Sequence, residues 1–454
     1  MNDDDFREAA LGVYDELLQR TGEGAPEHRL DATRRLVDVL GDPQRAYPII
    51  HLTGTNGKTS TSRMIESLVR AHGLRTGLLT SPHLISFNER IVLDGQPISD
   101  EALVRNWNDV SPYVEMVDAE LEAKGKAHLT FFEVLTGLAF AVFADAPVDV
   151  AIIEVGMGGE WDSTNVGDGD VAVFTPISLD HTTQLGSTIQ AIARTKSGII
   201  KPLSDVVTAR QDPEALSVLV DAATANEASL RCEGVDFDVM SSTLAVGGQL
   251  VTVRGLAHTY PEVFIPLYGE HQAQNAALAL AAVETFLGQG AHPLSPEVVD
   301  EAFATVTSPG RLQLIGVEPT VLVDAAHNPA GAQSLVNAIR ASFTFSEVAV
   351  VLGTLHDKDA AGVIAPLASL ANVFFVTEPE SSRARNADEL ADLVRAQVGE
   401  EKVIVYPSPR DAVDSARSWA MESAGRAVIV TGSIVLIGAI MEYAQENAWK
   451  ATNS

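Results

Sequence analysis

Apolar runs of strand length alternate with helical patterns along most of this 454-residue chain, and this alternation restricts the fold more than any other feature. Strands are expected over residues 47–52, 76–80, 149–154 and 170–175, and the last two of these runs are rich in Val and Ile. Helical patterns follow two of them, over 58–72 and 184–200. Strands that alternate with helices form a mostly parallel sheet with helices packed against it. The sequence therefore predicts an α/β protein.

A turn-forming cluster at 307–311 separates two regions of this pattern. Before the cluster, residues 231–267 alternate Val, Thr and Phe with polar residues around a Gly-Gly pair, which indicates an antiparallel hairpin, and a helix is expected over 271–287. After the cluster, strands are expected at 320–324, 348–353, 373–377, 403–406 and 427–430. We expect an N-terminal P-loop ATPase domain over 1–306 and a smaller, Rossmann-like α/β domain over 307–454.

The segment His51 to Ser60 has the form of a phosphate loop, because it follows a strand and opens a helix. Glycines in such a loop let backbone N–H groups turn toward phosphate, and the helix N-terminus adds partial positive charge. Lys58 is expected to reach the β- and γ-phosphates, and Thr59 is expected to face Mg²⁺. The residues expected to bind ATP here are Gly54, Thr55, Asn56, Gly57, Lys58, Thr59 and Ser60.

Composition excludes several classes of partner. The net charge of -30 repels nucleic acid and anionic membranes, so an anionic substrate has to be held by local donors or a metal. The single cysteine, Cys232, excludes an intrachain disulfide. The acidic N-terminus does not resemble a secretory signal, and the apolar stretch over 427–441 is too short for a bilayer. We expect a soluble cytoplasmic protein in which that stretch is a strand running into a helix.

From the phosphate loop onward the chain resembles the folylpolyglutamate and dihydrofolate synthases, a branch of the Mur ligase superfamily. The order and spacing of many short motifs carry the resemblance. They are Gly54-Thr55-Asn56-Gly57-Lys58-Thr59, Thr80-Ser81-Pro82-His83-Leu84, Asn88-Glu89-Arg90-Ile91, Phe131-Phe132-Glu133, Glu154-Val155-Gly156-Met157-Gly158-Gly159, Asp162-Ser163-Thr164-Asn165, Asp180-His181-Thr182, Lys196-Ser197-Gly198, His271-Gln272-Ala273-Gln274-Asn275, Pro309-Gly310-Arg311 and Asp324-Ala325-Ala326-His327-Asn328-Pro329.

The resemblance implies a Mg²⁺ site formed by Ser81, Glu154 and His181, with Thr59 beside it. It also implies that Lys196 is carbamylated and binds a second metal. A lysine in an apolar segment has a lowered pKa, and its neutral amine can react with CO₂. The alternative for Lys196 is an unmodified, salt-bridged lysine on a helix. Lys201, beside Pro202, is expected to face solvent.

The same resemblance implies roles for residues farther along the chain. Asn275, Arg311 and Asp324 are the expected nucleotide contacts, and a guanidinium at a domain hinge can couple domain closure to chemistry. His327 is expected near the reacting carboxylate and glutamate, with Ser433 as a second glutamate contact. Pro82, Arg90 and Phe132 are expected to bind folate, because an aromatic face suits the flat pterin ring. Lys58, Lys196 and His327 are the expected catalytic residues.

These motifs predict ATP-dependent ligation of L-glutamate to reduced folates, with dihydropteroate as a further expected substrate and an acyl phosphate as intermediate. A peptidoglycan-type Mur ligase is the first alternative, but only about fifty residues precede Thr53 here, where those enzymes carry an additional domain. The second alternative is a nucleotide-binding switch, which would leave Asp180, His181, Lys196 and Arg311 without a role. A monomer is expected.

Overall fold

An eight-stranded sheet forms the centre of the N-terminal region of the computed structural model, which describes residues 2–22 and 27–449. The strand order is β4-β3-β2-β5-β1-β6-β7-β8. The strands are β1 (Ile49–Thr53), β2 (Thr76–Leu79), β3 (Ile91–Leu93), β4 (Gln96–Pro97), β5 (Val150–Glu154), β6 (Val171–Phe174), β7 (Asp205–Thr208) and β8 (Ser229–Cys232). All neighbours from β2 to β8 pair in parallel, and β3 and β4 add an antiparallel ribbon at one edge.

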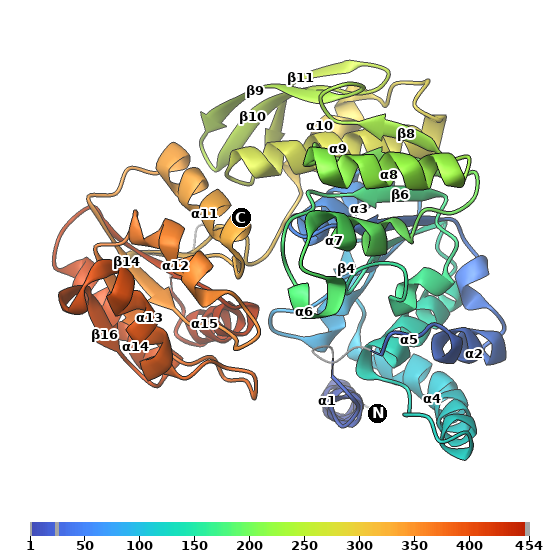
Figure 1. The fold of residues 1–454 in the computed structure, drawn as a ribbon, viewed down its shortest axis with the longest axis horizontal. Coiled ribbons are helices and arrows are strands. Elements are labelled where there is room, and N and C mark those ends of the chain that lie inside the picture. The colour runs from blue at the N-terminus through green and yellow to red at the C-terminus, as the bar shows by residue number, and fades with distance from the viewer. Residues whose placement is uncertain (1, 23–26, 450–454) are drawn as a thin grey trace. The chain divides into compact units, whose positions relative to one another are not determined.

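Helices cover both faces of this sheet (Figure 1). One face buries Ile49, Ala151 and Ile153 beneath α1 (Asp3–Leu18), α2 (Asp31–Val39), α4 (Asp100–Ala123) and α5 (Phe131–Asp145). Farther along that face, α7 (Ile189–Ser197) and α8 (Pro213–Ala225) cover β6 and β7. Helix α3 (Lys58–Ala71) packs on β2 and β5, and α10 (Pro296–Ala304) packs against α3. The remaining helices of this region are α6 (Thr182–Leu185) and α9 (Glu270–Gly288).

A second, six-stranded sheet is built from the C-terminal part of the chain, in the order β12-β13-β17-β14-β15-β16. Its strands are β12 (Gln313–Val317), β13 (Thr320–Val323), β14 (Glu347–Leu352), β15 (Val373–Val376), β16 (Val403–Val405) and β17 (Arg426–Thr431). Only β12 pairs antiparallel. A core on one face joins α11 (Pro329–Ser342), α12 (Ala360–Ala368) and α13 (Ala387–Val398). Helix α14 (Pro409–Met421) contacts β14 and β17, and α15 (Ile434–Glu446) contacts β17 and β12.

The chain divides into two units that are not contiguous in sequence. One unit contains residues 1–240, 252–263 and 274–305, and the other contains 241–251, 264–273 and 306–454. The chain therefore passes from one unit to the other five times. The segments around these passages include a three-stranded sheet of β9 (Asp238–Ala245), β10 (Gly248–Arg254) and β11 (Thr259–Ile265).

The predicted α/β fold with two sheets is confirmed. The hairpin expected at Gly247-Gly248 is present between β9 and β10, and the stretch over 427–441 is a strand followed by a helix. Two details of the prediction are wrong. The helix expected over 184–200 is divided into α6 and α7, because Gly186 has φ 101° and Thr188 caps a new helix. Residues 231–232 belong to β8 and pair in parallel with β7, so the antiparallel segment begins later than expected.

Candidate active site

The phosphate loop connects β1 to α3 in a space that only glycine fits at two positions. Gly54 has φ 150°, and a Cβ there would lie 1.8 Å from Thr175 Oγ1. Gly57 has φ 91°, and a Cβ there would lie 2.6 Å from Asn275 Oδ1. Asn275, predicted to contact nucleotide, is thus placed by α9 directly against the loop. Gly57 is the N-cap of α3. No side chain at this position therefore covers the positive end of the helix dipole.

Two lysines converge on one backbone oxygen of this loop. Lys196 Nζ donates to the Gly54 carbonyl oxygen at 2.8 Å, and Lys58 Nζ donates to the same oxygen at 3.2 Å. Lys196 is 4% exposed, at the end of α7. Burial, with a smaller contribution from the Lys58 charge, lowers the pKa of Lys196 to about 7. The Lys58 ammonium group beside a glycine-rich loop and a helix N-terminus forms a site suited to phosphate.

Two of the expected metal ligands, Ser81 and Glu154, lie at the carboxyl ends of the neighbouring strands β2 and β5, and His181 follows β6. Glu154 ends β5 with 1% exposure, and its Oε1 accepts a hydrogen bond from Thr59 Oγ1 at 3.0 Å. Ser81 follows β2 after one residue, and His181 is the N-cap of α6, with φ 49°. In the described residues there is no cluster of three or more His, Cys, Asp or Glu side chains suited to a metal. Hydroxyl and carboxylate oxygens nevertheless fit Mg²⁺, which usually keeps waters and takes its other ligands from phosphate.

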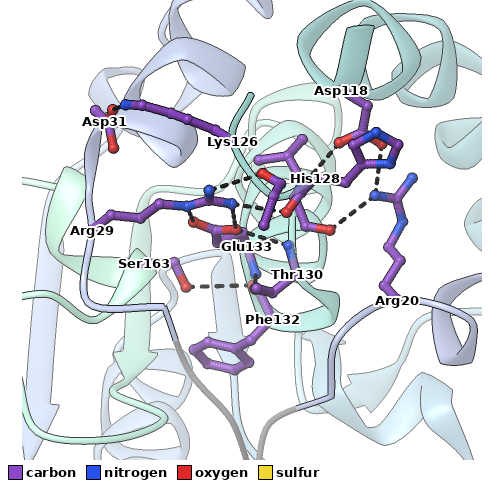
Figure 2. Close-up of polar contacts among 12 residues, drawn as sticks. Arg20, Arg29, Asp31, Asp118, Lys126, His128, Thr130, Phe132, Glu133 and Ser163 are labelled. Carbon is purple, nitrogen blue, oxygen red and sulfur yellow. Dashed lines mark hydrogen bonds and ion pairs between the residues drawn. The ribbon is translucent and has the colours of Figure 1, made fainter. Parts of the chain in front are cut away.

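Phe132, predicted to bind folate, lies on the first turn of α5 and is held by the residues around it (Figure 2). Thr130 and Glu133 form a capping box at this helix start. Arg29 binds both oxygens of Glu133, at 3.0 and 2.9 Å, and also donates to the carbonyl oxygens of Ala127 and His128. The ion pair is largely buried, so its two partners hold each other in one geometry. Phe132 therefore stands on a rigid helix end.

Asp162 is a neighbour of Phe132 that the sequence did not assign to the site. A Cβ on Gly156 would lie 2.6 Å from Phe132 Cε1 and 3.2 Å from Asp162 Oδ2, so the ring and the carboxylate lie against the same glycine. Asp162 is buried, and burial raises the pKa of its carboxyl group. The sequence signal for Asp162 is its position just after the glycine-rich segment 156–159. A short turn at this place can direct the side chain back toward the end of β5.

Arg90 and Pro82, also predicted to bind folate, lie in different surroundings. Arg90 is buried, donates from Nε to His83 Nδ1 at 2.7 Å, and places its guanidinium 5.1 Å from the centre of the Phe131 ring. Tyr14 reaches the other nitrogen of His83 at 3.4 Å. Pro82 is exposed. Arg90 thus belongs to a packed aromatic cluster, which leads to the adjacent Phe132 through Phe131.

Residues of the second unit form a separate group. Asp324 Oδ2 accepts from the Leu312 N–H at 2.8 Å and its Oδ1 accepts from the Ala326 N–H at 2.9 Å. Burial raises the pKa of Asp324, while the nearby Arg311 charge lowers it. His327 Nδ1 lies 2.9 Å from the Ala325 carbonyl oxygen. These contacts join Arg311 and Asp324 electrostatically and place His327 immediately before α11.

Two predictions about single side chains need comment. The expectation that Lys201 faces solvent is wrong: its side chain is 19% exposed, donates to the Asn165 carbonyl oxygen at 3.1 Å and lies 3.6 Å from Asp168 Oδ1. Burial accordingly lowers the pKa of Lys201. Ser433, predicted to contact glutamate, is buried and caps α15 by accepting from the Val435 N–H at 3.2 Å.

Comparison with known proteins identifies the family. The Mur ligase middle domain matches residues 52–283, and the Mur ligase glutamate ligase domain matches residues 310–434. A Mycobacterium tuberculosis protein named dihydrofolate synthase/folylpolyglutamate synthase is 44% identical over 91% of this chain and 90% of its own length. This chain is a member of the dihydrofolate synthase/folylpolyglutamate synthase family of Mur ligases.

Solved structures of this family agree with the fold. The Mycobacterium tuberculosis folylpolyglutamate synthase complexed with ADP has a TM-score of 0.93 and 42% identity, covering 97% of this chain and 99% of that one. Escherichia coli FolC in complex with DHPP and ADP has a TM-score of 0.81 and 30% identity, covering 93% and 94%. The family resemblance and the ligase class predicted from the sequence are confirmed. Across residues 2–22 and 27–449, no helix is both long enough and apolar enough to cross a membrane.

Proposed function

We propose that this Mur ligase joins L-glutamate to reduced folates and to dihydropteroate at the expense of ATP. The observation that carries the proposal is the convergence of Lys58 and Lys196 on the Gly54 carbonyl oxygen, beside the contact between Thr59 and Glu154. In a family whose curated relatives are dihydrofolate synthase/folylpolyglutamate synthases, this arrangement is suited to a polyphosphate and its counter-ion.

The reaction proceeds in two steps. A carboxylate oxygen of the folate substrate attacks the γ-phosphorus of ATP, the bond to the β-phosphate oxygen breaks, and an acyl phosphate and ADP form. The amine of glutamate then attacks the acyl carbon, phosphate leaves, and the amine loses a proton as the amide forms. The loop backbone and Lys58 neutralise charge on the transferred phosphoryl group and hold it in line with the attacking oxygen.

Mg²⁺ would be held by Ser81, Thr59, Glu154 and His181, where it would neutralise the charge that phosphate oxygens bring to this edge of the sheet. Lys196 is proposed to act as a carbamate: its neutral amine attacks CO₂, an N–C bond forms and one proton leaves. The buried position and lowered pKa of Lys196 support this step, because they favour the neutral amine at neutral pH. The unmodified lysine remains the alternative that the test of this step must exclude.

The remaining assignments follow from the same proposal. Phe132 receives the pterin ring, with Pro82 and Arg90 as neighbours, and Asn275, Arg311 and Asp324 contact the nucleotide. His327 and Ser433 are assigned to glutamate. Residues 1–306 are proposed as the ATP- and folate-binding domain, and 307–454 as the glutamate-ligase domain. The protein is proposed to act as a monomer in the cytoplasm, where ATP and folates are available.

One assay tests the function. Purified protein should release ADP only when glutamate is present with either tetrahydrofolate or dihydropteroate, and mass spectrometry should find the folate product heavier by one glutamate. Nucleotide binding without glutamate-dependent ADP release would instead support a switch. Activity with tetrahydrofolate, combined with failure to complement a strain lacking dihydrofolate synthase, would restrict the protein to polyglutamylation.

A further inference from the structure

A buried chain of hydrogen bonds connects β1 to the segment after β5. His51 is 0% exposed, and its Nε2 lies 2.9 Å from Thr164 Oγ1. Thr164 Oγ1 donates in turn to Asp162 Oδ1, which also accepts from the Thr164 N–H at 3.0 Å. The other oxygen, Asp162 Oδ2, accepts from the Met157 N–H at 2.9 Å. The carboxylate is therefore oriented at both of its oxygens.

The direction of the chain follows from the chemistry of its members. Burial lowers the pKa of His51 to about 3, so its imidazole is neutral and carries one N–H. The Thr164 hydroxyl has a single proton, which it donates to Asp162, and His51 Nε2 must then be the donor to Thr164. His51 Nδ1 is buried and accepts no hydrogen bond within the described residues. Reversing the chain would bury an unsatisfied N–H there, which is the more unfavourable state.

The Asp162 carboxylate binds the Met157 N–H, which lies in a segment that contacts both β1 and α7. We call residues 156–161 the glycine turn. Thr53, on the same face of β1 as His51, donates to the Gly158 carbonyl oxygen at 2.7 Å, and the Glu160 N–H donates to the Thr195 carbonyl oxygen at 2.8 Å. A Cβ on Gly159 would lie 2.7 Å from the Lys196 carbonyl oxygen. The glycine turn is therefore fixed between β1 and α7, and it has little space to adjust.

Phe132 and Asp162 meet at the first residue of the glycine turn. Their ring edge and carboxylate oxygen both lie close to the position that a Cβ on Gly156 would occupy, at the distances given above. A carboxylate at the rim of an aromatic face suits a flat heterocycle whose edge carries N–H donors, as a pterin does. The position of that carboxylate depends on Thr164 and, through it, on His51, and both of these side chains are buried.

We propose that His51 and Thr164 are positioning residues for the folate substrate, and that they act by orienting Asp162 beside Phe132. This inference rests on the proposed function, because it assumes that a pterin is bound at Phe132. Removal of the Thr164 hydroxyl group, which bonds the Asp162 carboxylate, should therefore impair folate use selectively.

The test compares Thr164→Val with Thr164→Ser in the full-length chain. Valine keeps the shape and removes the hydroxyl group, whereas serine keeps the hydroxyl group. We expect Thr164→Val to lower kcat/KM for tetrahydrofolate about tenfold, the effect of losing one hydrogen bond to a charged group. The KM for ATP should change less than about twofold, and Thr164→Ser should restore most of the loss. His51→Leu and His51→Gln form a second pair, because glutamine can place an amide N–H where Nε2 lies.

Two outcomes would overturn the inference. One is a loss that falls equally on ATP and tetrahydrofolate, or a Thr164→Ser enzyme as impaired as Thr164→Val, since both indicate a general structural effect. The other is a Thr164→Val protein with a lowered melting temperature and unchanged folate kinetics. If the wild-type protein shows no glutamate-dependent ADP release, the proposed function fails by itself. Calorimetric titration with tetrahydrofolate then still tests the positioning role, because Thr164→Val must weaken that binding.

Discussion

The two parallel sheets differ in how they use their carboxyl ends. At the end of β1 and β5, side chains from separate segments reach one another: Lys58 and Lys196 meet at Gly54, and Thr59 meets Glu154. At the end of β13, Asp324 is occupied by two backbone N–H groups of its own unit. The first edge thus brings together charged side chains that can pair with a phosphate and a cation. At the second edge, both carboxylate oxygens of Asp324 are already hydrogen-bonded within their own unit. The carboxyl end of a parallel strand can thus bring side chains of several segments together, or it can pair with the backbone that follows it.

Lys58→Ala gives the most severe test of this difference. We expect ATP turnover to fall at least about a thousandfold, because the Lys58 ammonium group, which donates to the loop backbone, is proposed to neutralise charge on the transferred phosphoryl group. ADP release measures the effect, and circular dichroism should show an unchanged fold. A variant with near-normal turnover would remove the phosphate-loop assignment and with it the contrast between the two edges.

Lys196→Ala is expected to lower turnover about a hundredfold, since a carbamate there would supply an anionic metal ligand. Added small carboxylic acids should restore part of the activity. The matched control is Lys201→Ala, from the same segment, which should keep activity within about threefold and lose about 1 kcal/mol of stability with its hydrogen bond. Electron density for a bare ammonium group at Lys196, in active protein prepared with bicarbonate, would contradict the modification.

Arg311→Ala should lower kcat about tenfold and leave the affinity for tetrahydrofolate unchanged. The guanidinium lies near Asp324 and His271 in the second unit, where its expected contact is with nucleotide phosphate. Steady-state kinetics combined with a direct folate-binding titration separate the two quantities. Equal losses in both would show that Arg311 belongs to the folate pocket, so that the second edge would also hold substrate.

Asp324→Asn should act on stability, with an expected decrease of about 1–3 kcal/mol in the free energy of unfolding. An amide keeps one acceptor oxygen and turns an NH₂ group toward a backbone N–H, so one of the two bonds is lost. Urea denaturation measures the effect, and Asp392→Asn, at a side chain that is 77% exposed, is the control. Equal free energies of unfolding for Asp324→Asn and Asp392→Asn would show that the two hydrogen bonds of Asp324 contribute little to stability.

The sequence predicted the central strands of both sheets because buried parallel strands are continuous apolar runs between turns. It missed the ribbon of β3 and β4, whose strands have three and two residues and are too short for a periodic signal. It also merged α6 with α7, since the break depends on the positive φ of Gly186. The order of the strands in the sheet could not be predicted from the sequence either. β1 lies between β5 and β6, and no local sequence pattern determines which strands pair.

The residues of the candidate site also fall into those that the sequence could predict and those that it could not. Gly54, Gly57, Lys58 and Thr59 could be named because they are contiguous, and Glu154 because it ends a strand. The motif around Asp162 does not by itself reveal a role for that residue. His51 and Thr164, which are hydrogen-bonded, lie 113 positions apart in the sequence. A contact of that separation exists only once the sheet has formed. The roles of all these residues stay predictions until the variants are measured.

The repeated passage of the chain between its two units limits how the protein can be divided into fragments for expression. A fragment encoding residues 306–454 would omit 241–251 and 264–273, which belong to the same unit, and one encoding 1–305 would carry those two segments as unmatched insertions. Neither half is therefore a sensible reagent for expression or for screening inhibitors. Fusion tags likewise belong outside residues 240–306, where the chain passes between the units.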